Sequence, residues 1–133
     1  MIRNTSNERG QSLVEVALAM PLLILIVMGI LDLGRAFYAY VALSDAAAEG
    51  AAYAAIHPDD TTQIVERVAD TSNVLVVIDP ALVSVDVPDT TPGNPITVTV
   101  QYEYQILTPI MNSFVPEGKI TMRSEVVQAI INP

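Results

Sequence analysis

The feature that most constrains this chain is an apolar stretch of 16 residues, Val16 to Leu31, without a single charged side chain. Extended back to Leu13, the stretch reaches 19 residues, close to the ~20 that a helix needs to cross a bilayer. A core helix of a water-soluble domain would keep a polar face, and this stretch provides none. The sequence therefore predicts a membrane-spanning helix.

Three residues should shape this helix. Pro21 lacks an N–H group and clashes with the carbonyl four residues earlier, so we expect a kink or local loosening there. Gly29 and Gly34 thin the far end of the helix, where a neighbouring helix could approach closely.

The charged residues predict an orientation. Residues 1–10 carry Arg3 and Arg9 against Glu8, whereas from residue 37 onward three basic residues face twelve acidic ones, a net charge of -9. The excess of basic residues before the span predicts a cytoplasmic N-terminus and a C-terminal domain outside the cytoplasmic membrane. So acidic a domain would be repelled by phosphate backbones, so we expect no nucleic-acid partner.

The helix should continue beyond the membrane. No breaker separates the span from Pro58, and ten alanines lie between Ala36 and Ala55, which favours one helix of about 45 residues. Aromatic residues at positions 37, 38 and 40 suit the membrane interface. The alanine surface could pack against the chain's own domain, against other subunits, or partly against both.

The remaining residues predict a small α+β domain. Asp60 opens a capping-box pattern for a second helix that ends near residue 72 or 73. Alternating apolar residues then predict three or four antiparallel strands against the helices, with a bulge after Ser124 in the last one. The expected strands are 74–78, 83–87, 96–106 and 120–131.

Residues for catalysis are scarce. Cysteine is absent and His57 is the only histidine, so neither a thiolate site nor a two-histidine zinc site can be assembled. The loop from Asp86 to Asn94 has oxygen donors, but their spacing fits no known calcium loop. We expect no enzyme activity, no cofactor and no defined metal site, with ion binding in this loop left open.

Several motifs resemble the TadE-like proteins of the tight-adherence pilus system. They are Arg9-Gly10-Gln11-Ser12-Leu13-Val14-Glu15, then Ala17-Leu18-Ala19-Met20-Pro21-Leu22-Leu23, then Gly29 and Asp32-Leu33-Gly34-Arg35-Ala36. The resemblance is strongest over residues 9–57 and reaches the downstream domain only in outline.

The resemblance implies a pilin-like protein. Its relatives are cut after a glycine by a membrane-embedded prepilin peptidase, which here makes Gly10 the last leader residue and Gln11 the first mature residue. Glu15 would then be the fifth mature residue and could pair with the new amine of a neighbouring subunit or its own. The major pilins of this system have tyrosine after that glutamate, whereas this chain has Val16.

Two functions follow as alternatives. In the first, residues 1–10 are a leader, 11–57 form the membrane and assembly helix, 58–133 form the outer domain, and the mature subunit enters a surface filament. In the second, the chain keeps its leader and serves as a single-pass anchored protein that binds a partner through the acidic domain. Glu15 would then merely snorkel to the interface, and Asp32 with Arg35 form an interfacial ion pair in either case.

Overall fold

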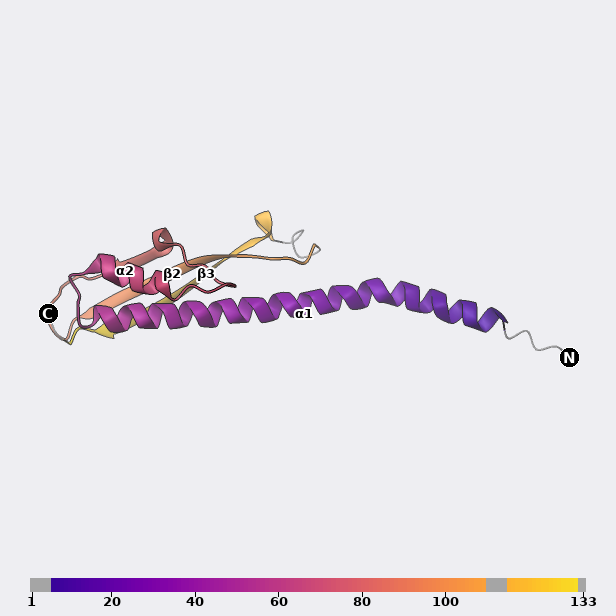
Figure 1. Cartoon of the computed structure of the whole chain (residues 1–133), viewed down its shortest axis with the longest axis horizontal. Helices are drawn as coiled ribbons and strands as arrows, with labels where there is room; N and C mark the ends of the chain where they lie inside the picture. Colours follow the sequence, from indigo (N-terminus) through magenta and orange to yellow (C-terminus); the bar gives the residue numbers. More distant parts are fainter. Residues whose placement is uncertain (1–5, 110–114, 132–133) are drawn as a thin grey trace.

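The computed structural model describes residues 6–109 and 115–131, and its dominant element is one long helix. Helix α1 spans Ser6–Ala54, 49 residues, or about 74 Å at 1.5 Å per residue. Its C-terminal part lies under a small domain, while its N-terminal part extends alone (Figure 1). Within the described chain, the Gly10–Ala54 stretch is long and apolar enough to cross a membrane.

The start of α1 differs from the prediction. Residues 6–10 were predicted to be a leader outside any fold element, but they form the first turns of α1. Residues 1–5, with Arg3, lie outside the described part. Pro21 lies inside α1, and the N-terminal part of the helix bends away from the axis of the rest (Figure 1).

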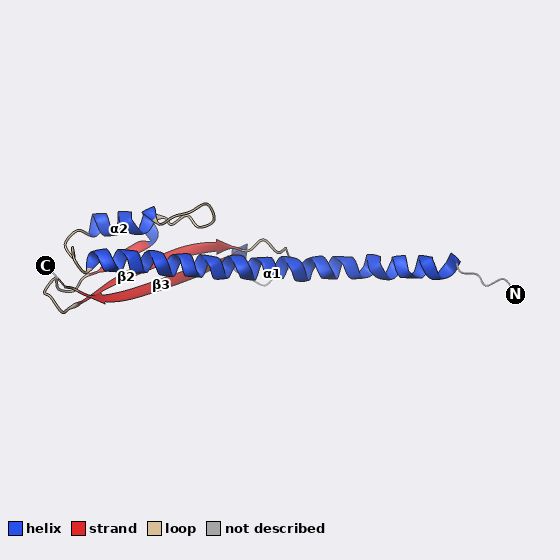
Figure 2. Cartoon of the chain, turned by 60° about the horizontal axis from the view of Figure 1, so that its bottom comes forward, coloured by secondary structure: helices blue, strands red, loops and turns tan. Residues whose placement is uncertain are grey.

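The domain is α+β, as predicted. Helix α2 (Thr61–Asp70) precedes three strands, β1 (Val83–Asp86), β2 (Pro95–Gln105) and β3 (Lys119–Ala129). The strands form one antiparallel sheet in the order β1-β2-β3, with short 3-10 turns η1 (Pro80–Leu82) and η3 (Pro116–Gly118) before β1 and β3. Figure 2 shows α2 and the strands gathered around the same end of α1.

The alternating pattern of β2 is confirmed by burial. Ile96, Val98, Val100 and Tyr104 are buried on the face that joins the core. On the other face Glu103 and Gln105 are exposed, whereas Thr97 and Gln101 are half-buried and Thr99 is buried. The pairing of β2 with β3 runs without interruption over eleven residues of each strand. The bulge predicted after Ser124 is therefore wrong.

The segment predicted as a first strand is not a strand. Val76 and Ile78 are buried, but residues 74–78 pair with no other strand in the described chain. Asn73 explains the difference, because its side-chain oxygen accepts hydrogen bonds from the N–H groups of Leu75 and Val76 (2.9 and 3.0 Å). Those are groups that a ladder would need, and asparagine favours such local turns.

The core is built on small residues of α1. The alanines of its C-terminal half supply much of the buried surface, and Ile64 and Val68 of α2 pack onto it. Asp60 caps α2 by accepting a hydrogen bond from the Gln63 N–H (3.1 Å), as the sequence predicted. The backbone N–H of Ile131 donates to the Ala55 carbonyl (2.8 Å), which ties the end of the chain to the end of α1.

Candidate assembly helix and its junction with the domain

The predicted processing and assembly residues lie on the part of α1 that contacts no other element. Gly10, Gln11 and Glu15 are all exposed, and neighbouring Leu13 and Leu18 have about three quarters of their surface open (72% and 75%). Because Gln11 and Glu15 are four residues apart in one helix, they share a face. The domain therefore does not cover these residues, and their side chains face whatever surrounds the helix.

The glycines of α1 fall into two groups. A methyl group added at Gly10, Gly29 or Gly34 would meet nothing within 4 Å. At Gly50, in contrast, it would overlap a methyl group of Val68 and lie 3.3 Å from another on Val98. Only Gly50 among these four is therefore required by packing inside the chain, a role that the sequence analysis missed.

Asp32 joins α1 to the end of β2. Its carboxylate accepts hydrogen bonds from the backbone N–H groups of Leu107 (3.3 Å) and Thr108 (2.8 Å) and from the Thr108 hydroxyl. Its backbone carbonyl accepts another from the Tyr104 hydroxyl (2.9 Å). Asp32 is 9% exposed, so a buried carboxylate connects the end of the apolar segment to the residues that follow β2.

Arg35 contributes less to this junction. Its guanidinium Nη1 lies 3.6 Å from Asp32 Oδ1, and its Cζ lies 5.5 Å from the centre of the Tyr104 ring. The side chain is 43% exposed, so solvent weakens both contacts. Burial raises the pKa of the Tyr104 hydroxyl, which keeps this donor protonated.

Sequence reasoning paired Asp32 with Arg35 and missed its main partners. Thr108 is 76 residues away in the chain, and a threonine in a predicted loop gives no sign of this role. The alternation of residues 96–106 puts Tyr104 on the buried face of the sheet, but nothing in that alternation indicates what its hydroxyl reaches. One sequence feature did indicate a partner for Asp32. An acidic residue directly after an apolar span needs a hydrogen-bond donor or a cation if it is buried.

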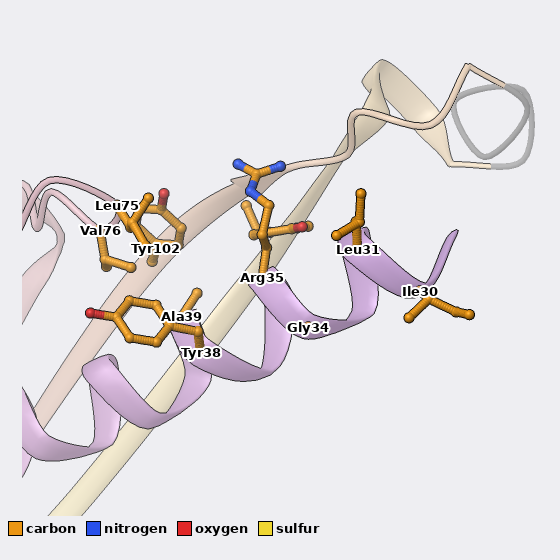
Figure 3. Close-up of a pocket in the computed structure, with 10 residues that line it drawn as sticks. Ile30, Leu31, Gly34, Arg35, Tyr38, Ala39, Leu75, Val76 and Tyr102 are labelled. Atoms are coloured by element: carbon orange, nitrogen blue, oxygen red, sulfur yellow. The ribbon is translucent and has the colours of Figure 1, made fainter. Parts of the chain in front are cut away.

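Two apolar cavities flank the junction. One, of about 480 Å³, is lined by α1 residues from Ile30 to Ala39 and by Leu75, Val76 and Tyr102 (Figure 3). The other, of about 370 Å³, is lined by Ile26, Leu33, Ile120 and their neighbours on α1 and the sheet. Both begin at the end of the apolar stretch.

The loop from Asp86 to Asn94 is organised by its own side chains. The Asp89 carboxylate accepts hydrogen bonds from the Thr91 backbone and hydroxyl (3.1 and 2.8 Å) and from the Asn94 amide (2.9 Å). The bonds from Thr91 hold the pKa of Asp89 below its usual value. The carboxylate thereby stabilises the turn that leads into β2.

Comparison with known proteins gives one match. Residues 10–52 match the family model described as TadE-like protein, which confirms the resemblance over this segment. The match begins at Gly10, runs through Asp32 and the alanine-rich part of α1, and ends before α2. No curated protein and no solved structure matches the chain.

Proposed function

Since residues 10–52 form a TadE-like segment, we propose that the protein is a pilin-like subunit of a tight-adherence-type pilus. The family match and the long apolar helix support a membrane protein that is associated with such a pilus. In the proposed sequence of events, α1 inserts into the cytoplasmic membrane, a prepilin peptidase cuts after Gly10, and the mature subunit assembles with others. The role is structural and needs no catalytic step.

The observation that carries the proposal is the division of α1. Its N-terminal part exposes one large aliphatic side chain after another, from Leu13 to Leu31, although its C-terminal part is packed within the domain. A helix that is apolar all round needs an apolar environment. A bilayer supplies it before assembly, and the helices of neighbouring subunits supply it afterwards.

Glu15 gives this exposed segment a means of assembly. A carboxylate at the centre of a span costs roughly 2.5–3.5 kcal/mol on insertion scales, and Glu15 costs less because it lies near the start. Transfer into a bundle of apolar helices removes the nearby water, so the carboxylate then requires a cation or hydrogen-bond donor. This requirement favours a partner that only processing provides.

Cleavage after Gly10 would create that partner. The new α-amine at Gln11 would stand at the N-terminus of α1, where the helix dipole disfavours a positive charge. Glu15, one turn further along, offsets the charge of its own amine or of a neighbour's. A methyl group at position 10 would meet nothing, so packing within the fold does not require a glycine there.

The orientation in this proposal rests on charge. Arg9 precedes the span, and the domain beyond it is strongly acidic. Basic residues are retained on the cytoplasmic side, so we place the domain outside. After assembly, the domain would cover the surface of the filament.

The test is assembly in cells that express the pilus machinery. Glu15→Leu and Glu15→Gln should reduce subunit in the sheared surface fraction at least ~10-fold, because both lose the carboxylate. The chain should still insert into the membrane, since both variants keep the apolar stretch from Val16 to Leu31 and remove a charge from its start. Asp45→Asn, at an exposed acidic position on the packed part of α1, is the matched control and should assemble normally.

Normal assembly of both Glu15 variants would contradict the proposal. It would favour the second function, an anchored protein whose carboxylate snorkels to the interface. Loss of assembly by Asp45→Asn as well would show that any lost charge is harmful, and the specific role of Glu15 would be rejected.

A further inference from the structure

The domain carries an exposed aliphatic turn beside α1. Val74 is 99% exposed, Val77 68% and Leu75 63%. Three exposed aliphatic side chains within four residues form an apolar patch of the kind that marks an interaction site. Nothing in the proposed cleavage or in the role of Glu15 accounts for them.

The turn is held in this conformation. The Asn73 side-chain oxygen accepts hydrogen bonds from the backbone N–H groups of Leu75 and Val76. The Ser72 hydroxyl oxygen accepts a hydrogen bond from the backbone N–H of Ile78 (2.9 Å). Val76 and Ile78 are buried in the core. These anchors point the other three side chains outward as a fixed group.

The turn lies just beyond the apolar stretch, beside the aromatic part of α1. Leu75 and Val76 line the same cavity as Leu31, but Figure 3 shows them beside Tyr38 and Ala39, at the far end of that cavity from Leu31. Tyr38 is seven residues beyond Leu31, about 10 Å along the helix axis. Tyrosine favours the membrane–water interface, so the turn is placed at the outer edge of the lipid headgroups.

A second apolar group lies closer to the membrane span. Leu107, whose N–H donates to Asp32, is 58% exposed, and Ile120 is 42% exposed. Ile120 lines the other cavity together with Ile26 and Leu33. Residues from three separate segments therefore form an aliphatic collar beside α1, which consists of Val74, Leu75, Val77, Leu107 and Ile120.

We propose that the aliphatic collar inserts into the headgroup layer of the bilayer on the domain's side, with lipid filling both cavities. Both cavities are continuous with the membrane span, because Ile26, Ile30 and Leu31 line them. Lipid that covers these residues therefore extends into the cavities. Apolar cavities are unfavourable for water. Arg35, half-exposed at the rim of the first cavity, is placed to meet lipid phosphate.

This contact would add a second membrane attachment to α1. The domain would rest on the bilayer at a fixed height, and subunit extraction into a filament would have to remove lipid from the collar. The inference rests on the membrane span but not on processing or on which leaflet the domain meets.

The absence of cysteine from the chain allows a direct test with the full-length protein. Single cysteines at Val74→Cys, Leu75→Cys and Val127→Cys are labelled with an environment-sensitive fluorophore and reconstituted into phosphatidylcholine vesicles that contain nitroxide lipids. Val127 is a matched control, because it is an exposed valine (56%) on β3 opposite Thr97, outside the collar. Val74 is almost fully exposed, so its replacement does not disturb the fold.

Headgroup nitroxides should quench the labels at 74 and 75 at least ~3-fold more than the label at 127, as expected for side chains in the interfacial layer. Equal quenching at all three positions would overturn the proposal. Labels at 74 and 75 that are shielded only at high protein-to-lipid ratio, without nitroxide quenching, would also overturn it and would assign the collar to a second copy of the chain.

Discussion

The two parts of α1 differ in what their side chains contact. From Gly10 to Leu31 most large aliphatic side chains of the helix are exposed, and a methyl group added at Gly10 or Gly29 would meet nothing within 4 Å. From Ala36 to Ala54 the same helix is the centre of a packed domain, and its one glycine, Gly50, is in close contact with α2 and β2. The comparison separates residues that serve the fold from residues that serve the membrane and other subunits.

Asp32 marks the boundary between the two parts. It is the first charged residue after the span, and it is also the first α1 residue with hydrogen bonds to the domain among the contacts described above. Its hydrogen bonds add to the packing of Ala36 to Ala54 against the sheet and α2, and they hold the segment after β2 at the end of the apolar stretch.

The largest effect on stability is expected at Gly50. Gly50→Leu would force a side chain into Val68 and Val98, and overpacking of this kind costs about 1–3 kcal/mol or more. Gly29→Leu is the matched change in the free part and should alter stability by less than about 0.5 kcal/mol. Chemical unfolding of the detergent-solubilised chain, followed by circular dichroism, measures both.

An equal loss of stability in the two glycine variants would contradict the difference between the two parts of α1. A Gly29→Leu variant that folds normally but fails to assemble would support that difference. The glycine would then be needed by a neighbouring helix, as its open surroundings suggest.

A smaller effect is expected at the boundary. Asp32→Ala leaves the N–H groups of Leu107 and Thr108 without their acceptor, which costs about 1–3 kcal/mol for a buried group. Hydrogen exchange of these two amides should accelerate, whereas the amides of α2 should stay protected. Asp45→Ala, at an exposed position on the same helix, should change neither.

Tyr104→Phe provides a graded version of the same experiment. It removes only the hydroxyl that donates to the Asp32 carbonyl, so the loss should be about 1 kcal/mol. Tyr40→Phe is the control, because Tyr40 is exposed (54%).

For Asp32→Ala, unchanged hydrogen exchange at Leu107 and Thr108 would show that the junction does not depend on this carboxylate.

The sequence predicted the features that local pattern determines. The span, the extension of α1 towards Pro58, the cap at Asp60 and the alternation of β2 all depend on residues close together in the chain. The same local reasoning was wrong at residues 74–78, where the apolar residues resemble a strand but Asn73 takes the N–H groups into a turn.

The junction could not be predicted because its partners are distant. Asp32 and Thr108 are 76 residues apart, and the close contact of Gly50 with Val68 depends on how α2 folds back. The candidate processing site has the opposite character. Gly10, Gln11 and Glu15 are assigned from the resemblance to the TadE-like proteins, and the fold adds that all three are exposed.

The most direct test of the account is the intact mass of the chain from the envelope of cells that contain a prepilin peptidase, with Gly10→Val as a matched variant. The account predicts a wild-type chain that begins at Gln11 and a variant that keeps its first ten residues. The variant should fold normally, because a side chain at position 10 meets nothing. A wild-type chain that still begins at Met1 would contradict the central claim.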